Sequence, residues 1–245
     1  MYIASPTKNM RVTSIAIIQI LASQSLAQAS VPSKHQPTLA ACRVKLEMYE
    51  KHVIEQLAVL LHLDVWSSSS TPIDGIQYWR SDVQSYDASF SDRLASTITK
   101  FMAMNNIRSS GSTSTLVDVC GVRTRVGIDV AQAKFSSEPF PYKRLASGDD
   151  SAAILALLTN EVVEATILAR VRSSAKDYVE AHGVSTKNDA QSANDLPTLV
   201  ERFFKEVLIP LTKDLEVSVL LKLSLEPAKK EHENDITSSA SIKNL

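Results

Sequence analysis

Apolar residues recur at intervals of three and four along most of the chain, which is the spacing of amphipathic α-helices. In residues 38–64 the apolar positions with this spacing are Leu46, Tyr49, Val53, Ile54, Leu57, Leu60 and Leu61. The same spacing predicts helices over residues 83–104, about 115–135, 150–181 and 195–225, the last with a kink at Pro210. No segment shows a convincing alternation of apolar and polar residues. The pattern therefore predicts an all-α fold in which long helices surround a shared core.

Polar connections, rich in serine or broken by proline and glycine, separate these helices. The composition agrees with a helical chain, because it has only 6 glycines and 6% aromatic residues, whereas β-sandwiches and barrels need turn glycines and strand aromatics. We expect residues 30–228 to form one helical domain and the polar residues 229–245 to be a disordered tail.

The N-terminus carries the parts of a secretory signal. Arg11 precedes the apolar run VTSIAIIQILA, and an Ala-x-Ala pair ending at Ala29 supplies the small residues of a cleavage site. We therefore expect residues 1–29 to be a signal peptide and the protein to be secreted, with Met10 as an alternative start that would leave residues 1–9 as an upstream extension. The other interpretation is an ordinary amphipathic or disordered N-terminal segment.

Charge and cysteine usage narrow the classes of partner and site. The net charge of −1 gives no reason to expect nucleic acid as a partner, and no apolar run reaches the ~20 residues of a membrane span, so we expect no membrane partner either. Cys42 and Cys120 lie in no CxxC or Cys/His cluster, which predicts no metal site. The two cysteines would form one disulfide in a secreted chain or remain two buried thiols, and the sequence supports both alternatives equally.

The helix predicted around residues 121–135 is apolar, yet it carries two cations. Arg123 and Lys134 are eleven residues apart, which at ~100° per residue is close to three full turns. Both therefore lie on one face, with the small residue Gly127 between them. Such a face suits an anionic ligand. The alternative is that both long side chains reach outward from the helix to solvent.

Three other predicted helices carry polar residues within apolar stretches. Arg43 lies on the first helix, Asn160 and Glu164 are four residues apart, and so are Thr212 and Glu216. A buried carboxylate without a partner is costly, so such groups are usually paired, protonated or functional. Together the four helices would offer three cations, an amide, a hydroxyl and two carboxyl groups, which suit a small dianion with a hydroxyl group and an ether oxygen.

On these residues the chain resembles the eukaryotic, all-helical chorismate mutases of the AroQ class. The resemblance covers nearly all of residues 38–228 and rests on four motifs in the family's order, namely RVKLEMYEKHVI, RTRVGIDVAQAKF, LLTNEVVEATILARVRSSAKDY and VLIPLTKDLEVSVLL. Combined with the predicted signal peptide, it makes the chain most similar to the secreted chorismate mutase effectors of plant-associated fungi, in particular smut fungi.

The resemblance implies a chorismate mutase fold with its active site inside a four-helix bundle. It also implies the conversion of chorismate to prephenate without cofactor or metal, and a homodimer. By position in the motifs, Arg43 and Arg123 would bind the two substrate carboxylates, Lys134 and Glu216 would contact the ether oxygen, Asn160 and Glu164 would hold the side of the ring hydroxyl, and Thr212 would help to place a carboxylate.

The resemblance also implies where the protein would act. We expect a secreted mutase that acts in a host plant and diverts the shikimate pathway, and translocation into host cells is a further expectation. Host proteins are the other expected partners, and residues 67–107, which match no family motif, are with the tail the expected contact surface. The alternatives are a helical host-binding effector whose mutase site is secondary or inactive, and a helical bundle without a site. Gly111 and Ser112 lie closer to Arg123 than the loop that senses aromatic amino acids in the yeast-like branch, which argues against regulation by tyrosine or tryptophan.

Overall fold

The described part of the chain contains the four motifs. The computed structural model describes residues 38–61, 73–107, 113–148, 150–182 and 189–225. All of them belong to Pro37–Leu245, one of the two units into which contacts divide the chain. The predicted signal peptide (1–29), the start at Met10, the pair 111–112 and the tail 229–245 lie outside the described residues.

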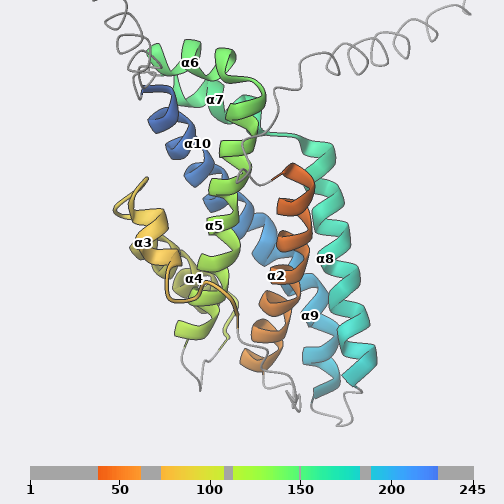
Figure 1. The fold of residues 1–245 in the computed structure, drawn as a ribbon. Helices are drawn as coiled ribbons and strands as arrows, with labels where there is room; N and C mark the ends of the chain where they lie inside the picture. The colour runs from red at the N-terminus through yellow and green to blue at the C-terminus, as the bar shows by residue number, and fades with distance from the viewer. Residues whose placement is uncertain (1–37, 62–72, 108–112, 149, 183–188, 226–245) are drawn as a thin grey trace, which may run out of the picture. The chain divides into compact units, whose positions relative to one another are not determined.

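Helices are the only regular elements among these residues, so the all-α fold class is confirmed. In chain order they are α2 (Leu39–Leu60), α3 (Trp79–Gln84), α4 (Phe90–Met104), α5 (Ser114–Ser137), α6 (Pro139–Ser147), α7 (Ser151–Leu158), α8 (Glu161–His182), α9 (Asp189–Phe203), a π-helical turn (Phe204–Leu208) and α10 (Ile209–Leu225) (Figure 1).

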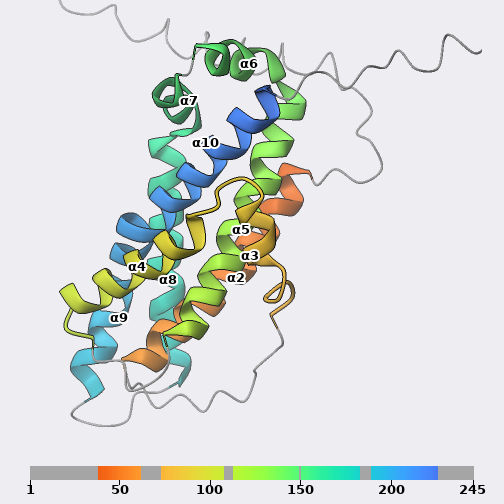
Figure 2. The ribbon, with the colours of Figure 1, turned by 90° about the vertical axis from the view of Figure 1, so that its left-hand side faces the viewer.

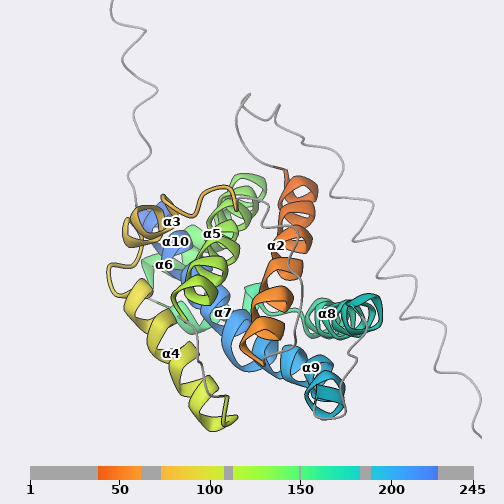
Figure 3. The same ribbon diagram turned by 90° about the horizontal axis from the view of Figure 1, so that it is seen from below.

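Long helices pack side by side around α5. This helix contacts α2 on one side and α10 on another, while α8 packs against α9 and α2. The ion pairs Lys45–Asp129 and Glu50–Arg123 show that α2 and α5 run in opposite directions, because residue numbers rise along one helix as they fall along the other. Seen end on, α5 lies between the pair α3 and α4 and the helices α2 and α8 (Figure 3). With neighbours on several sides, α5 is buried over most of its surface, which explains why its sequence is apolar nearly all round.

Two shorter groups of helices complete the arrangement. α6 and α7 contact each other and α10, and Figure 2 shows α6 over the C-terminal part of α10. On the other side α3 is fastened to α5 by Trp79, whose side chain is fully buried and whose Nε1 donates a hydrogen bond to Asp118 Oδ1 (3.1 Å). A Cβ on Gly121 would lie 2.4 Å from the Trp79 ring, so only glycine allows this approach. The described part of the segment 67–107 is thus anchored to the core by Trp79.

The predicted helix 150–181 is two helices. Asp150 caps α7 as its SGDD motif indicated, because its Oδ1 accepts a hydrogen bond from the N–H of Ala153 (2.9 Å). Thr159 then takes an extended conformation, and Asn160 starts α8 by accepting a hydrogen bond from the N–H of Val163 (3.1 Å). The prediction of one continuous helix was wrong because it overlooked that Asn160 is itself a strong N-cap. No single described helix is long and apolar enough to cross a membrane, although α7 and α8, bent by 57°, pass the same length and composition test as a pair.

The last predicted helix also begins earlier and is interrupted. α9 starts at Asp189, before the predicted start at Asp195, and includes Pro197 within it. The kink expected at Pro210 stays a prediction, and what the structure has just before this proline is a π-helical turn. In this turn the N–H of Ile209 donates a hydrogen bond to the carbonyl of Phe204, five residues back, so the turn contains one residue more than an α-helical turn. Pro210, which has no N–H group to donate, follows directly after Ile209.

Cys42 and Cys120 are free, buried thiols. Of the two alternatives that the sequence left open, the structure has the thiols and not the disulfide. The antiparallel register of α2 and α5 explains this: Lys45 lies opposite Asp129, whereas Cys120 is beyond Arg123 toward the other end of the pair. At 1.5 Å per residue this separates the cysteines by roughly 15 Å, far more than the ~7 Å between Cα atoms that a disulfide spans.

Candidate active site

The site is built around the guanidinium group of Arg123, on α5. Its side chain is only 3% exposed, and it donates a hydrogen bond from Nη1 to Thr212 Oγ1 on α10 (2.9 Å). Its Nη2 lies 3.8 Å from Glu50 Oε1 on α2, and its plane lies over the ring of Phe204, 5.4 Å from the ring centre. Nε is buried and has no hydrogen-bond partner among the described residues. A buried arginine with one unused donor is a ready binding group for an anion.

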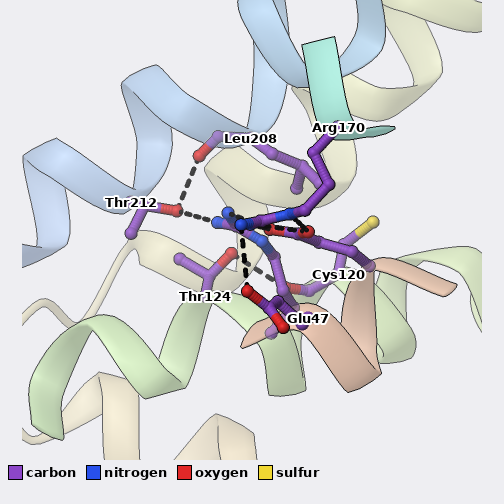
Figure 4. A network of polar contacts seen from close by, with 8 residues as sticks. Glu47, Cys120, Thr124, Arg170, Leu208 and Thr212 are labelled. Atoms are coloured by element: carbon purple, nitrogen blue, oxygen red, sulfur yellow. Dashed lines mark hydrogen bonds and ion pairs between the residues drawn. The ribbon is translucent and has the colours of Figure 1, made fainter. Parts of the chain in front are cut away.

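Thr212 is held in place by the π-helical turn. Its hydroxyl donates a hydrogen bond to the carbonyl of Leu208 (2.7 Å) while it accepts the one from Arg123 (Figure 4). Because the proton of the hydroxyl is used on the helix backbone, its oxygen is available to the guanidinium. The turn before Pro210 therefore sets the side chain that meets Arg123.

Lys134 and Glu216 form the second contact between α5 and α10. Lys134 Nζ donates a hydrogen bond to Glu216 Oε2 (3.1 Å). The predicted common face of Arg123 and Lys134 is confirmed, because both reach α10, at positions one helical turn apart. Gly127 lies between them, and a Cβ there would be 3.0 Å from Thr212 Cγ2 and 3.5 Å from Glu216 Cγ. A residue without a side chain thus lets the two helices approach closely at the site.

Asn160 and Glu164 stand at the start of α8. The Asn160 side chain is used as the helix cap, and Glu164 forms an ion pair with Lys213 of α10, whose Nζ lies 2.5 Å from Glu164 Oε1. Lys213 was not among the residues that the sequence singled out. Its position between Thr212 and Glu216 was the available signal, since four polar residues, Thr212, Lys213, Asp214 and Glu216, interrupt an otherwise apolar stretch of helix there.

Arg43 takes no part in the contacts among Arg123, Lys134, Thr212 and Glu216. It is exposed on α2 and makes no hydrogen bond or ion pair with any described residue. Its neighbourhood follows from the register, because Lys45 lies opposite Asp129, so Arg43 faces the stretch of α5 between Arg123 and Lys134. Its role as a ligand for a carboxylate stays a prediction.

The residue that faces Arg123 from α2 is Glu50, which lies within the first motif but was not among the candidate site residues. Glu50 is buried and accepts hydrogen bonds from Nε and Nη2 of Arg170 on α8 (3.0 and 2.9 Å). Arg170 also donates to Glu47 Oε1 (3.0 Å), as Figure 4 shows. This network joins α2 and α8 behind Arg123. Sequence reasoning missed it because nothing in the helical spacing tells which arginine a glutamate on another helix will meet.

Burial controls the ionisation of the site. It raises the pKa of Glu50, which the cations Arg123 and Arg170 oppose, and it raises the pKa of Glu216, which Lys134 and Arg123 oppose. It lowers the pKa of the Arg123 guanidinium, which Glu50 opposes. An arginine remains protonated in spite of this. Among the described residues no group of three His, Cys, Asp or Glu side chains is placed to hold a metal ion.

Curated proteins similar in sequence are chorismate mutases. The chorismate mutase of Saccharomyces cerevisiae is 35% identical over 100 residues, which are 41% of this chain and 38% of that protein. The cytosolic chorismate mutase 2 of Zea mays is 31% identical over 109 residues, 43% of each chain, and that of Trichoderma parareesei is 32% identical over 116 residues, 46% of this chain and 43% of the other. The chain is a homologue of the eukaryotic chorismate mutases. The matches span about two fifths of the length of these relatives, and no family model matches the chain.

Solved chorismate mutases share the fold over most of the chain. The chloroplast chorismate mutase of Zea mays superimposes with a TM-score of 0.52 at 20% identity, covering 78% of this chain and 96% of that one. The chorismate mutase of Candida albicans, solved in complex with L-Trp, gives a TM-score of 0.50 at 20% identity, with 76% and 91% covered. The expected chorismate mutase fold is thereby confirmed.

Proposed function

We propose that the protein is a chorismate mutase, which converts chorismate to prephenate by a cofactor-free Claisen rearrangement. The observation that carries the proposal is the pair of contacts that Arg123 and Lys134 make with Thr212 and Glu216 across α5 and α10. Homology to chorismate mutases suggests the substrate, and these contacts bring together two cations, a hydroxyl and a carboxyl group, which suit such a dianion.

Binding the two substrate carboxylates selects the reactive conformation. Free chorismate is flexible, and clamping both ends lowers the entropy cost of bringing its reacting carbons together. Arg123 would bind one carboxylate through its unused Nε and its Nη groups, on a base made rigid by Glu50 and Thr212. Arg43, unpaired among the described residues, would turn from α2 to bind the other.

Lys134 and Glu216 would act on the ether oxygen. In the rearrangement one C–O bond breaks as one C–C bond forms within the same molecule, and negative charge grows on the ether oxygen. A lysine ammonium beside that oxygen binds the transition state better than the ground state, which is the condition for raising the rate. Glu216 must be protonated to donate a hydrogen bond to the same oxygen, and burial raises its pKa in that direction.

Product identification tests the reaction directly. The purified full chain is incubated with chorismate, and the products are followed by proton NMR. We expect stoichiometric formation of prephenate, without added metal or cofactor. Undiminished chorismate, or a product other than prephenate, from a folded sample would refute the proposal.

Secretion into a host plant, with diversion of the shikimate pathway there, is the biological part of the proposal. It is supported by Arg11, the apolar run that follows and the small residues ending at Ala29. The test is the N-terminal sequence of the protein recovered from culture medium after expression of the full chain in a fungal host. A mature protein beginning at Ser30 supports export, whereas retention in the cells with an intact N-terminus contradicts it.

The second candidate is a host-protein-binding effector whose mutase site is secondary or inactive. The observation in its favour is the α3–α4 segment, where Tyr78 is 60% exposed beside the buried Trp79 and Met104 is 70% exposed at the end of α4. Replacing Tyr78 and Met104 with serine leaves the Trp79 anchor intact. Loss of partner capture with unchanged turnover would favour this candidate, and unchanged capture would exclude this surface.

A homodimer is the third part of the proposal. It rests on the resemblance and on exposed apolar residues, namely Val162 and Val163 at the start of α8 and Val44 and Met48 on α2. Sedimentation equilibrium of the full chain measures the mass. Twice the chain mass is the expected result, and a single chain mass at micromolar concentration would exclude a stable dimer.

A further inference from the structure

Lys213 reaches from α10 to the beginning of α8. Its Nζ lies 2.5 Å from Glu164 Oε1, and it donates a hydrogen bond to the hydroxyl of Thr159 (3.2 Å). The side chain is only 19% exposed. It sits one residue after Thr212 and three before Glu216, so it belongs to the same turn of α10 as the two residues that meet Arg123 and Lys134.

Lys213 is the cation that compensates the negative charge on Glu164 Oε1. Glu164 Oε1 is shielded from solvent, and no described residue completes a hydrogen bond to it. A carboxylate oxygen removed from water without a partner is costly, so the nearby ammonium compensates the charge. Because the ammonium lies against Oε1, the other oxygen of the carboxylate, Oε2, is the one that can accept a hydrogen bond from a ligand.

The second contact of Lys213 falls on the break between α7 and α8. Thr159 is the residue in extended conformation there, and Asn160 caps the helix that carries Glu164. By bonding to the Thr159 hydroxyl and pairing with Glu164, Lys213 links α10 to the residue between α7 and α8 and to the carboxylate one turn into α8.

We propose that Lys213 is a positioning residue for the site, which holds the Glu164 carboxylate in the orientation that accepts a hydrogen bond from the hydroxyl group of the substrate ring. The inference rests on the proposed mutase function. It assigns a role to a fourth cation of the proposed site, beside Arg43, Arg123 and Lys134. A contact of this kind contributes equally to ground state and transition state, so its loss raises KM and leaves kcat close to the wild-type value.

A double-mutant cycle in the full chain tests the role. The variants are Lys213→Met, which keeps the length and removes the charge, Glu164→Gln, and both together. Each single change should raise KM at least about tenfold, the usual effect of losing a hydrogen bond to a charged group. The double variant should have the KM of Glu164→Gln alone, because Lys213 acts through Glu164. Lys213→Arg should restore most of the wild-type KM.

Lys222→Met is the matched control. Lys222 lies on the same helix and donates to the backbone carbonyl of Ser85 (2.7 Å), away from the site. Its loss should leave KM unchanged. If the effects of Lys213→Met and Glu164→Gln multiply, or if Lys213→Met behaves like Lys222→Met, the positioning role is wrong while the mutase function stands. A folded wild type without turnover refutes the mutase function itself, and the role with it.

Discussion

Lys134 Nζ lies 3.1 Å from Glu216 Oε2, one turn along α10 from the place where Arg123 meets Thr212. An ammonium and a carboxyl group are thus held together between two helices. Burial favours the neutral form of Glu216, and the neighbouring lysine favours the ionised form. The balance between these two effects decides whether Glu216 can donate a hydrogen bond.

The pH dependence of turnover should report Glu216. The charged and titratable groups near it are Lys134 and Arg123 of α5, Lys213 of α10 and Tyr142 of α6. Burial places its pKa above the ordinary glutamate range, so the active protonated form is present below that pKa and is lost as pH rises through it. The rate should therefore fall on the alkaline side. Glu216→Gln, which always carries a donor, should retain activity and flatten the profile; identical profiles for both proteins would mean that Glu216 does not act as an acid.

Gly127→Ala should reduce turnover although alanine is the better helix former. The new Cβ would lie 3.0 Å from Thr212 Cγ2, so α10 must shift by a few tenths of an ångström from α5. The higher helix propensity of alanine, worth up to ~1 kcal/mol, offsets part of the loss in the free energy of unfolding that this strain causes. We expect kcat/KM to fall about tenfold, less than the ~10²-fold that a 1 Å displacement costs. Gly148→Ala is the control, since its Cβ would meet only the carbonyl of Leu145 at 3.6 Å; an equal effect of both changes would contradict the explanation.

Glu50→Gln should destabilise the protein and weaken the site together. The amide cannot replace the charge that faces Arg170 and Arg123, so the buried Arg123 loses its nearest carboxylate and the partly exposed Arg170 keeps only Glu47. We expect the free energy of unfolding in urea to fall by about 1–3 kcal/mol, with a lower kcat/KM. Glu47→Gln removes an exposed partner of the same Arg170 and should change stability by no more than about 0.5 kcal/mol. Equal losses in the two variants would show that the buried position of Glu50 is unimportant.

Cys42 and Cys120 should be slow to react in the folded protein. Burial raises the pKa of both thiols, which leaves little thiolate at neutral pH. A thiol reagent should label neither cysteine in the native state and both after denaturation without reductant, as read from the intact mass. A mass that shows no labelling in denaturant would reveal a disulfide and contradict the register of α2 and α5.

Helical spacing predicted what lies on one helix and much less of what lies between helices. The common face of Arg123 and Lys134 follows from eleven residues at 100° each, so the sequence was sufficient for it. The break at Asn160 was missed because a favourable apolar spacing continues through it and outweighed the local signal, namely that asparagine is a strong N-cap residue. Helical spacing therefore predicts the face of a helix on which a side chain lies, but not the residue of another helix that it contacts.

The charge network shows the same limit. The pairing of Glu50 with Arg170, and of Glu164 with Lys213, joins residues more than forty positions apart. Either glutamate has several possible cationic partners in the sequence, and only the packing of α2, α8 and α10 selects among them. The motifs gave Arg43 and Arg123 the same expected role, binding a substrate carboxylate. In the structure, however, Arg123 is buried and Arg43 is exposed.

Turnover of chorismate by the full chain, compared with Lys134→Ala and with Lys143→Ala, tests the central claim most directly. Lys143 is exposed on α6 and touches the ring of Phe135, so it is a lysine close to Lys134 with no place in the site. We predict rapid loss of chorismate absorbance with the wild type and with Lys143→Ala, and a rate roughly 10²–10³-fold lower with a still-folded Lys134→Ala. A folded wild type that leaves chorismate unchanged, or a Lys134→Ala variant as fast as the wild type, would contradict the account.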